Sequence, residues 1–112
     1  MTTRDRSVTP APPAASIEEL LPHAESAAAL LRSLANAQRL MILCHLSGGA
    51  LSVSELNVRV PLSQSALSQH LAKLRESGLV ATARRGQVVI YSVVPGPAAA
   101  LVATLKELYC SN

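Results

Sequence analysis

Apolar residues recur with helical spacing in the first part of the chain. From residue 16 to residue 34 they fall mostly three or four positions apart, which predicts an amphipathic helix. Ser16 and Glu19 have the spacing of a capping box and are expected to start this helix. Pro22 lies so early in the pattern that it should disturb only the first turns.

Two more helices are expected before residue 62. Asn36 can cap a helix whose apolar face continues until the glycine pair at 48 and 49 stops it. Ser52 and Glu55 form a second capping-box pair, and they predict a short helix that the turn at Pro61 ends. The first of these two helices should be largely buried.

A longer helix follows, and its two sides differ in character. Ser63 is expected to cap it and Gly78 to end it. Leucines at 67, 71 and 74 share one side, which should pack against the core. The opposite, exposed side collects short polar side chains, namely Gln64, Ser65, Ser68 and Gln69.

After this helix the pattern changes from helical to alternating. The stretches Leu79 to Ala83 and Val88 to Val93 are rich in β-branched residues and predict the two strands of a hairpin. Its basic tip is made by Arg84, Arg85, Gly86 and Gln87. Residues Ala98 to Tyr109 then predict a last amphipathic helix.

The composition agrees with one small helical domain. A chain of 112 residues, 49% of them hydrophobic, has room for a single core, and its two tyrosines are its only aromatics. Residues 1–15 contain three prolines and no apolar periodicity, so we expect a disordered tail before a domain at 16–112. The predicted fold class is mainly α with a small β-hairpin, with about five helices and a two-stranded wing.

The distribution of charge along the chain narrows the range of possible functions. From Arg32 to Arg85 there are seven basic and two acidic residues, so this segment carries a charge of +5. Such an excess suits a phosphate-binding surface, although charge alone is also typical of a solvated basic face. We expect no enzyme and no cofactor, because the sequence offers no nucleophile beside a base, no carboxylate pair and no phosphate-binding loop.

The sequence also bears on location. No apolar run approaches the roughly 18 residues of a membrane helix, and the first sixteen residues lack the apolar stretch of a signal peptide. We therefore expect a cytoplasmic protein without a membrane partner, whose two cysteines begin as thiols.

The order of the predicted elements is that of a winged helix-turn-helix. An α-helix fits the DNA major groove, and short hydrogen-bonding side chains near its N-terminus can reach base edges. The helix that begins at Ser63 has such side chains, and its free backbone N–H groups could hold a phosphate. Taken alone, this polar side could be merely solvated. The short helix before it and the basic hairpin after it favour DNA binding.

Three segments carry a family resemblance: LLRSLANAQRLMILCHLSGGALSVSEL, LSQSALSQHLAKLRESGLV and RRGQVVIYSV. Over about residues 28–110 the chain resembles the ArsR/SmtB repressors, and the segments match that family's dimerisation, reading and wing elements. The resemblance implies a homodimer on palindromic double-stranded DNA, with base contacts from Ser65, Ser68 and Gln69. It further implies backbone or minor-groove contacts from Gln64 and from a wing made by Arg84, Arg85 and Gln87. Ser63, at the helix start, completes the predicted DNA-binding set.

Many proteins of that family sense metals, but the ligands are missing here. The arsenic-type site resembles a Cys-x-Cys in the short helix, where this chain has Ser52, Val53 and Ser54. The zinc-type site uses Asp, His and Glu on the last helix, which offers Glu107 alone. The three histidines lie on separate helices, so we expect no metal site.

The two cysteines remain. Cys44 and Cys110 could each be a small packed hydrophobe. However, their ILC and LYC contexts resemble a metal-free dithiol subgroup of sulfide- and redox-responsive biofilm and haemolysin regulators. The resemblance implies that reactive sulfur species or oxidants link the two thiols and lower DNA affinity. Either cysteine could attack first: Cys110 should be more accessible, whereas Arg39 or His45 could favour a Cys44 thiolate.

An alternative of another class stays open. The chain could be an effector-independent DNA-binding protein or an anti-silencing interaction module that has kept the fold without a thiol switch. Nothing in the sequence excludes this function.

Overall fold

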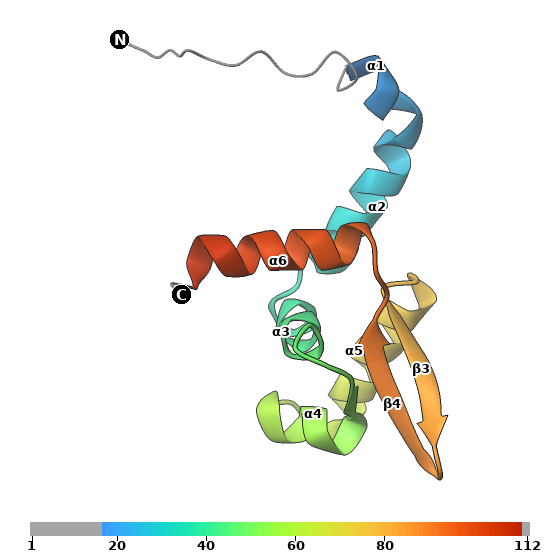
Figure 1. Ribbon diagram of the computed structural model, residues 1–112, viewed down its shortest axis with the longest axis vertical. Helices are drawn as coiled ribbons and strands as arrows, with labels where there is room; N and C mark the ends of the chain where they lie inside the picture. Colours follow the sequence, from blue (N-terminus) through green and yellow to red (C-terminus); the bar gives the residue numbers. More distant parts are fainter. Residues whose placement is uncertain (1–16, 111–112) are drawn as a thin grey trace.

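The computed structural model describes residues 17–110. The first helical segment consists of α1 (Ile17–Leu20), the 3-10 turn η1 (Leu21–His23) and α2 (Ala24–Leu34). Pro22 sits in the 3-10 turn and produces the irregular start that was predicted. The predicted cap at Ser16 and the tail at 1–15 lie outside the described residues. Figure 1 shows α1 and the start of α2 projecting from the body of the molecule.

Three predicted caps define the central helices α3 (Ala37–Leu46), α4 (Val53–Arg59) and α5 (Gln64–Glu76). Asn36 Oδ1 accepts a hydrogen bond from the Arg39 backbone N–H at 3.0 Å. Ser52 and Glu55 form a complete capping box, with reciprocal bonds of 3.1 and 2.8 Å. Ser63 Oγ accepts from the Ala66 N–H at 3.1 Å. Because each side chain satisfies an otherwise unpaired N–H, the three helix starts are set locally.

The predicted two-stranded hairpin is present, and a third, short strand joins it in the sheet. Strands β3 (Val80–Arg85) and β4 (Val88–Val93) form the antiparallel hairpin, and β2 (Leu51–Ser52) adds to the other edge of β4. The register pairs Tyr91 with Leu51 on one side and with Thr82 on the other. A strand of two residues is too short to produce an alternating pattern, so sequence reasoning missed it.

The tip of the wing was predicted to have four residues, and this length was wrong. Strand β3 continues through Arg84 and Arg85, which pair with Val89 and Val88, so the turn contains only Gly86 and Gln87. A two-residue turn between antiparallel strands needs positive φ, which glycine adopts without strain, and Gly86 has φ 66°. The two arginines therefore belong to the strand.

One apolar core joins the helices to the sheet. Leu34, Ile42, Leu43, Leu56, Leu67, Leu71, Leu74, Val80 and Val102 are among its buried members. The last helix, α6 (Pro97–Tyr109), lies across α3 and contributes Val102 to this core (Figure 1). In residues 17–110 no helix has both the length and the apolar character needed to cross a membrane.

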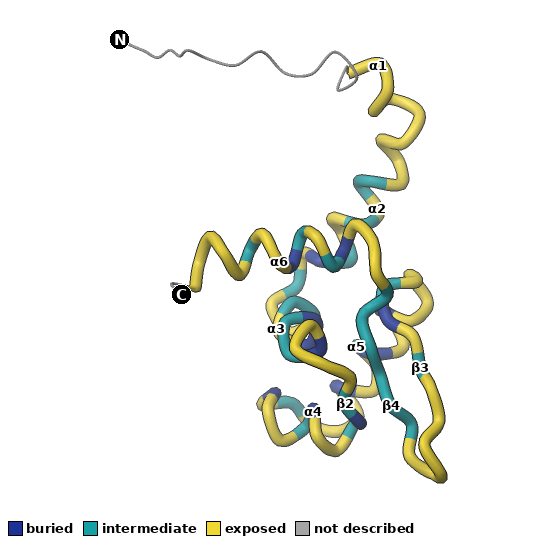
Figure 2. Tube along the Cα trace, viewed as in Figure 1, coloured by how far each residue is buried: buried dark blue, intermediate teal, exposed yellow. Residues whose placement is uncertain are grey.

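Several large apolar side chains stay outside the core. Figure 2 shows α1 and the C-terminal half of α6 largely exposed. The large exposed apolar residues on α1, η1, α2 and α6 are Ile17, Leu20, Leu21, Leu31, Leu108 and Tyr109. An open apolar groove of about 400 Å³ runs between α2, α3 and α6, with Leu31, Leu40 and Leu101 in its lining. These helices therefore leave apolar surface in contact with solvent in a single copy.

Two positions on α4 test how the core is packed. Leu56 is 0% exposed and Val58 is 85% exposed. Leu56→Ala should lower the free energy of unfolding by about 2–5 kcal/mol, since it removes buried methyl groups and leaves a cavity. Val58→Ala is the matched control and should change it by less than about 0.5 kcal/mol. Urea denaturation at one fixed protein concentration measures both, and equal effects would contradict the described packing of α4.

Candidate nucleic-acid interface and cysteine pair

The leucines of α5 hold its polar side toward solvent. Leu67, Leu71 and Leu74 are all 0% exposed. Since side chains three and four positions apart share one side of a helix, burying them directs the opposite side outward. All of the predicted reading residues on that side are exposed, namely Ser63, Gln64, Ser65, Ser68 and Gln69. His70, between the two sides, is half-buried.

The wing presents its polar residues at the far end of the hairpin. Arg84, Arg85 and Gln87 are all exposed there, and Figure 1 shows this end extending beyond the core. Because successive residues of a strand point to opposite faces, Arg84 and Arg85 are turned to opposite sides of the hairpin.

The wing lies within electrostatic reach of the start of α4. The Ser52 backbone N–H donates to Glu55 Oε1 at 2.8 Å, and this bond is the largest cause of the lowered pKa of Glu55. The positive charges of Arg59 and Arg85 lower that pKa further. The Glu55 carboxylate, which feels the charge of Arg85 on the wing, is thus already engaged in capping a helix.

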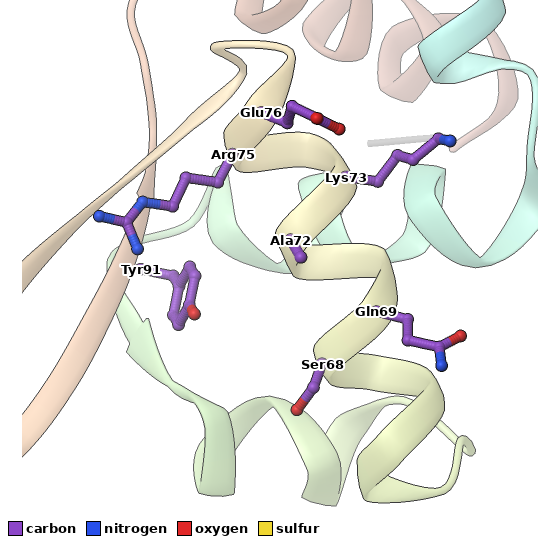
Figure 3. Close-up of a pocket in the computed structure, with 7 residues that line it drawn as sticks. All are labelled: Ser68, Gln69, Ala72, Lys73, Arg75, Glu76 and Tyr91. Atoms are coloured by element: carbon purple, nitrogen blue, oxygen red, sulfur yellow. The ribbon is translucent and has the colours of Figure 1, made fainter.

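A shallow hollow of about 670 Å³ separates α5 from the hairpin, and sequence reasoning did not find it (Figure 3). Its lining consists of Ser68, Gln69, Ala72, Lys73, Arg75, Glu76 and Tyr91. In Figure 3 Ser68 and Arg75 lie on the side of α5 toward Tyr91, whereas Gln69 and Lys73 lie on the other side. Ser68 and Gln69 are therefore joined here by two cations outside the predicted set, while Arg84, Arg85 and Gln87 are not in the lining.

A signal for part of this hollow was present in the sequence. Lys73 follows Gln69 by four residues, which places it on the same side of the helix. Tyr91 gave no such signal, because its placement depends on pairing with both β2 and β3.

The cysteines lie on two helices that pack together. Cys44 is half-buried in the last turn of α3, and Cys110 is exposed directly after α6. Both are free thiols. Burial raises the pKa of Cys44, the charge of Lys106 opposes that rise, and a negative charge on Cys110 adds to it. The charge state of Cys110 thus acts on the Cys44 thiol across the contact between α6 and α3.

The cation beside Cys44 differs from the two candidates considered from the sequence. Arg39 donates from Nε to the Ser33 carbonyl at 2.8 Å and from its guanidinium to the Arg32 carbonyl at 3.4 Å, so it serves the end of α2. Neither it nor His45 is among the groups that shift the pKa of Cys44. The cation that favours ionisation of Cys44 is instead Lys106, which the packing of α6 on α3 brings to this end of α3.

Possible metal ligands are dispersed. Among residues 17–110 no group of three or more His, Cys, Asp or Glu side chains is placed to hold a metal ion.

Comparison with known proteins identifies the family. The sequence model of the bacterial regulatory proteins of the arsR family matches residues 36–82, from the cap of α3 into β3. The transcriptional activator HlyU of Vibrio cholerae is 45% identical over 95 residues, which cover 85% of this chain and 88% of that protein. The chain belongs to the ArsR family.

Two further likenesses support the assignment of this ArsR-family chain. The biofilm growth-associated repressor of Xylella fastidiosa is 38% identical over 95 residues, covering 85% of this chain and 83% of the repressor. The structure of reduced HlyU from Vibrio cholerae superimposes with a TM-score of 0.79 and covers 85% of this chain and 100% of that one. The ArsR-family chain is accordingly a winged-helix DNA-binding transcriptional regulator and not an enzyme.

Proposed function

We propose that this ArsR-family regulator is a dimeric repressor that reads a palindromic operator with α5 and releases it when Cys44 and Cys110 become linked. The observation that carries the DNA-reading part is the exposed polar side of α5 beside a basic hairpin. The relatives include an activator and a repressor, and the repressor is the biofilm growth-associated protein.

The residues of α5 divide by chemistry into two roles. The glutamine amides and serine hydroxyls at its start can both donate and accept hydrogen bonds, which suits the mixed edges of bases in the major groove. Ser65, Ser68 and Gln69 form the base-reading set, and Gln64 would contact the DNA backbone or the minor groove. Ser63 and the free N–H groups beside it suit a phosphate oxygen. Lys73 and Arg75, farther along the helix, add cations for the DNA backbone.

The wing would contact the DNA backbone or the minor groove. Arg84, Arg85 and Gln87 lie at its exposed end, and the two arginines face opposite ways. Cations bound to phosphate contribute affinity without reading sequence, and their contribution weakens as salt rises. The wing would therefore strengthen binding to all DNA.

The dimer would form through α2 and α6. The groove between these helices and α3 is apolar, and Leu31 beside it is exposed in a single copy. A twofold axis through such a surface buries the same residues from both subunits. It would also set two copies of α5 about 34 Å apart, one helical turn of DNA, which is why the operator should be a palindrome.

The switch would use a persulfide as its oxidant. The thiolate of one cysteine attacks the outer sulfur of a persulfide RSSH, forms a cysteine persulfide and releases the thiol RSH. The second thiolate attacks the cysteine sulfur of that persulfide and expels hydrogen sulfide. Two thiols and one RSSH thus give one disulfide, one RSH and one H₂S, and the two electrons lost by the thiols reduce the persulfide.

The link would act on DNA through α3. This helix packs against α5 on one side and α6 on the other. Bridging Cys44 to Cys110 would tie the end of α6 to the end of α3 and change the relation between the dimer helices and the two reading helices. DNA affinity would fall because the two copies of α5 would no longer match the half-site spacing.

One observation favours the effector-independent alternative. Burial raises the pKa of Cys44, which leaves less thiolate near neutral pH. A thiol of this kind reacts slowly unless something nearby favours its charged form. Persulfide treatment of the serine variants separates the thiol switch from effector-independent DNA binding.

Base reading and backbone contact can be separated by two variants. Gln69→Ala should weaken binding to the operator by about 1–3 kcal/mol and leave binding to random DNA nearly unchanged. The double change Arg84→Ala and Arg85→Ala should weaken both and flatten the dependence of log K on log salt. Fluorescence anisotropy at several salt concentrations measures all four affinities. Equal losses on both DNAs for Gln69→Ala would contradict base reading.

The dimer surface can be tested by placing a charge in it. Leu31→Glu should convert a dimer into a monomer at micromolar concentration, because a buried unpaired carboxylate is costly. Light scattering gives the mass in solution. Val58→Glu, which places the same charge at an exposed apolar position on α4, is the control and should remain dimeric. A monomeric parent protein would end the dimer proposal.

The switch predicts a product and a loss of binding. After treatment with a persulfide donor, the intact mass should show one intramolecular link per chain, and operator affinity should fall. Cys44→Ser and Cys110→Ser should each bind DNA normally yet fail to respond, since each lacks one of the two thiols. If the double serine variant still releases DNA on treatment, the effector-independent function is the correct one.

A further inference from the structure

Lys106 occupies the junction between the two cysteine-bearing segments. Its carbonyl accepts the Cys110 backbone N–H at 2.8 Å, so Cys110 lies one helical turn beyond it. Its Nζ donates to Ser47 Oγ at 3.0 Å across the gap between α6 and α3. Ser47 Oγ in turn donates to the Cys44 carbonyl at 2.6 Å. The ammonium is therefore held at the end of α3 that carries Cys44.

The surroundings of Cys44 otherwise disfavour a thiolate. The thiol lies in the last turn of α3, at the negative end of the helix dipole. It is also half-buried, and burial is the largest cause of its raised pKa. Lys106 and Cys110, both contributed by the α6 side, are the charged or titratable groups that act on this thiol, and Lys106 alone acts in favour of its ionisation.

A purely structural role would explain the Lys106 contact poorly. The hydrogen bond to Ser47 is exposed, and an exposed contact made by a long side chain contributes little to stability. Lys106 is also the only basic residue in α6. Its position over α3 matters more for the charge that it brings than for the contact that it makes.

We propose that Lys106 is a positioning residue of the thiol switch, and that its ammonium, anchored by Ser47, favours the thiolate form of Cys44. This inference rests on the proposed function. A larger thiolate fraction at Cys44 speeds whichever of the two attacks that residue performs, because the thiolate is the nucleophile in both.

The test measures Cys44 alone and needs neither DNA nor a bridge. In a reduced Cys110→Ser background, the rate of alkylation by iodoacetamide is followed against pH with Lys106 intact, with Lys106→Gln and with Lys106→Arg. Loss of an exposed charge pair changes an equilibrium by about two- to fivefold. Lys106→Gln should thus raise the pH midpoint by roughly 0.3–0.7 units, and Lys106→Arg should keep the parent midpoint.

Glu107→Gln is the matched control, because it changes the charge of the next exposed residue of α6 without touching the contact to Ser47. It should not raise the midpoint. If Lys106→Gln lowers the melting temperature but leaves the midpoint unchanged, Lys106 only tethers two helices and the proposal is wrong. Failure of the thiol switch itself gives a different result, namely that the double serine variant still releases DNA after treatment with a persulfide donor.

Discussion

The burial of three leucines on α5 is the constraint on which the rest of this molecule depends. Leu67, Leu71 and Leu74 are fully enclosed, and each sits a helical turn from the next. Rotating α5 about its axis would expose them at a cost of about 1.5–3 kcal/mol for each side chain. The same rotation would hide the polar side chains opposite. One packing requirement therefore stabilises the domain and selects which residues are offered to DNA.

Much of this arrangement could be predicted from the sequence, because it depends on local chemistry. Asn36, Ser52 and Ser63 each cap a helix through a neighbour three residues away, and such pairs are visible in a linear sequence. The family resemblance added the expected roles of the helices and the wing. The comparisons confirm the family and its DNA binding, and the contact residues stay predictions.

The features that were missed depend on contacts between distant segments. Strand β2 has two residues and exists because β4 offers it an edge. The position of Tyr91 follows from that pairing. Lys106 and Ser47 are 59 residues apart, so only the crossing of α6 over α3 reveals that they meet. The first strand of the wing was predicted to end at Ala83, two residues before its true end at Arg85, because alternation alone does not show where strand pairing ends and the turn begins.

The corner between α2 and α3 has a consequence for how a strain at α6 would spread. Asn36 caps α3 by accepting the Arg39 N–H, and the Arg39 side chain reaches back to carbonyls at the end of α2. A single residue thus fastens both helix ends, and the short connection between them has little freedom to act as a hinge. If the far end of α3 moved, α2 would therefore turn with it rather than pivot at the connection between them.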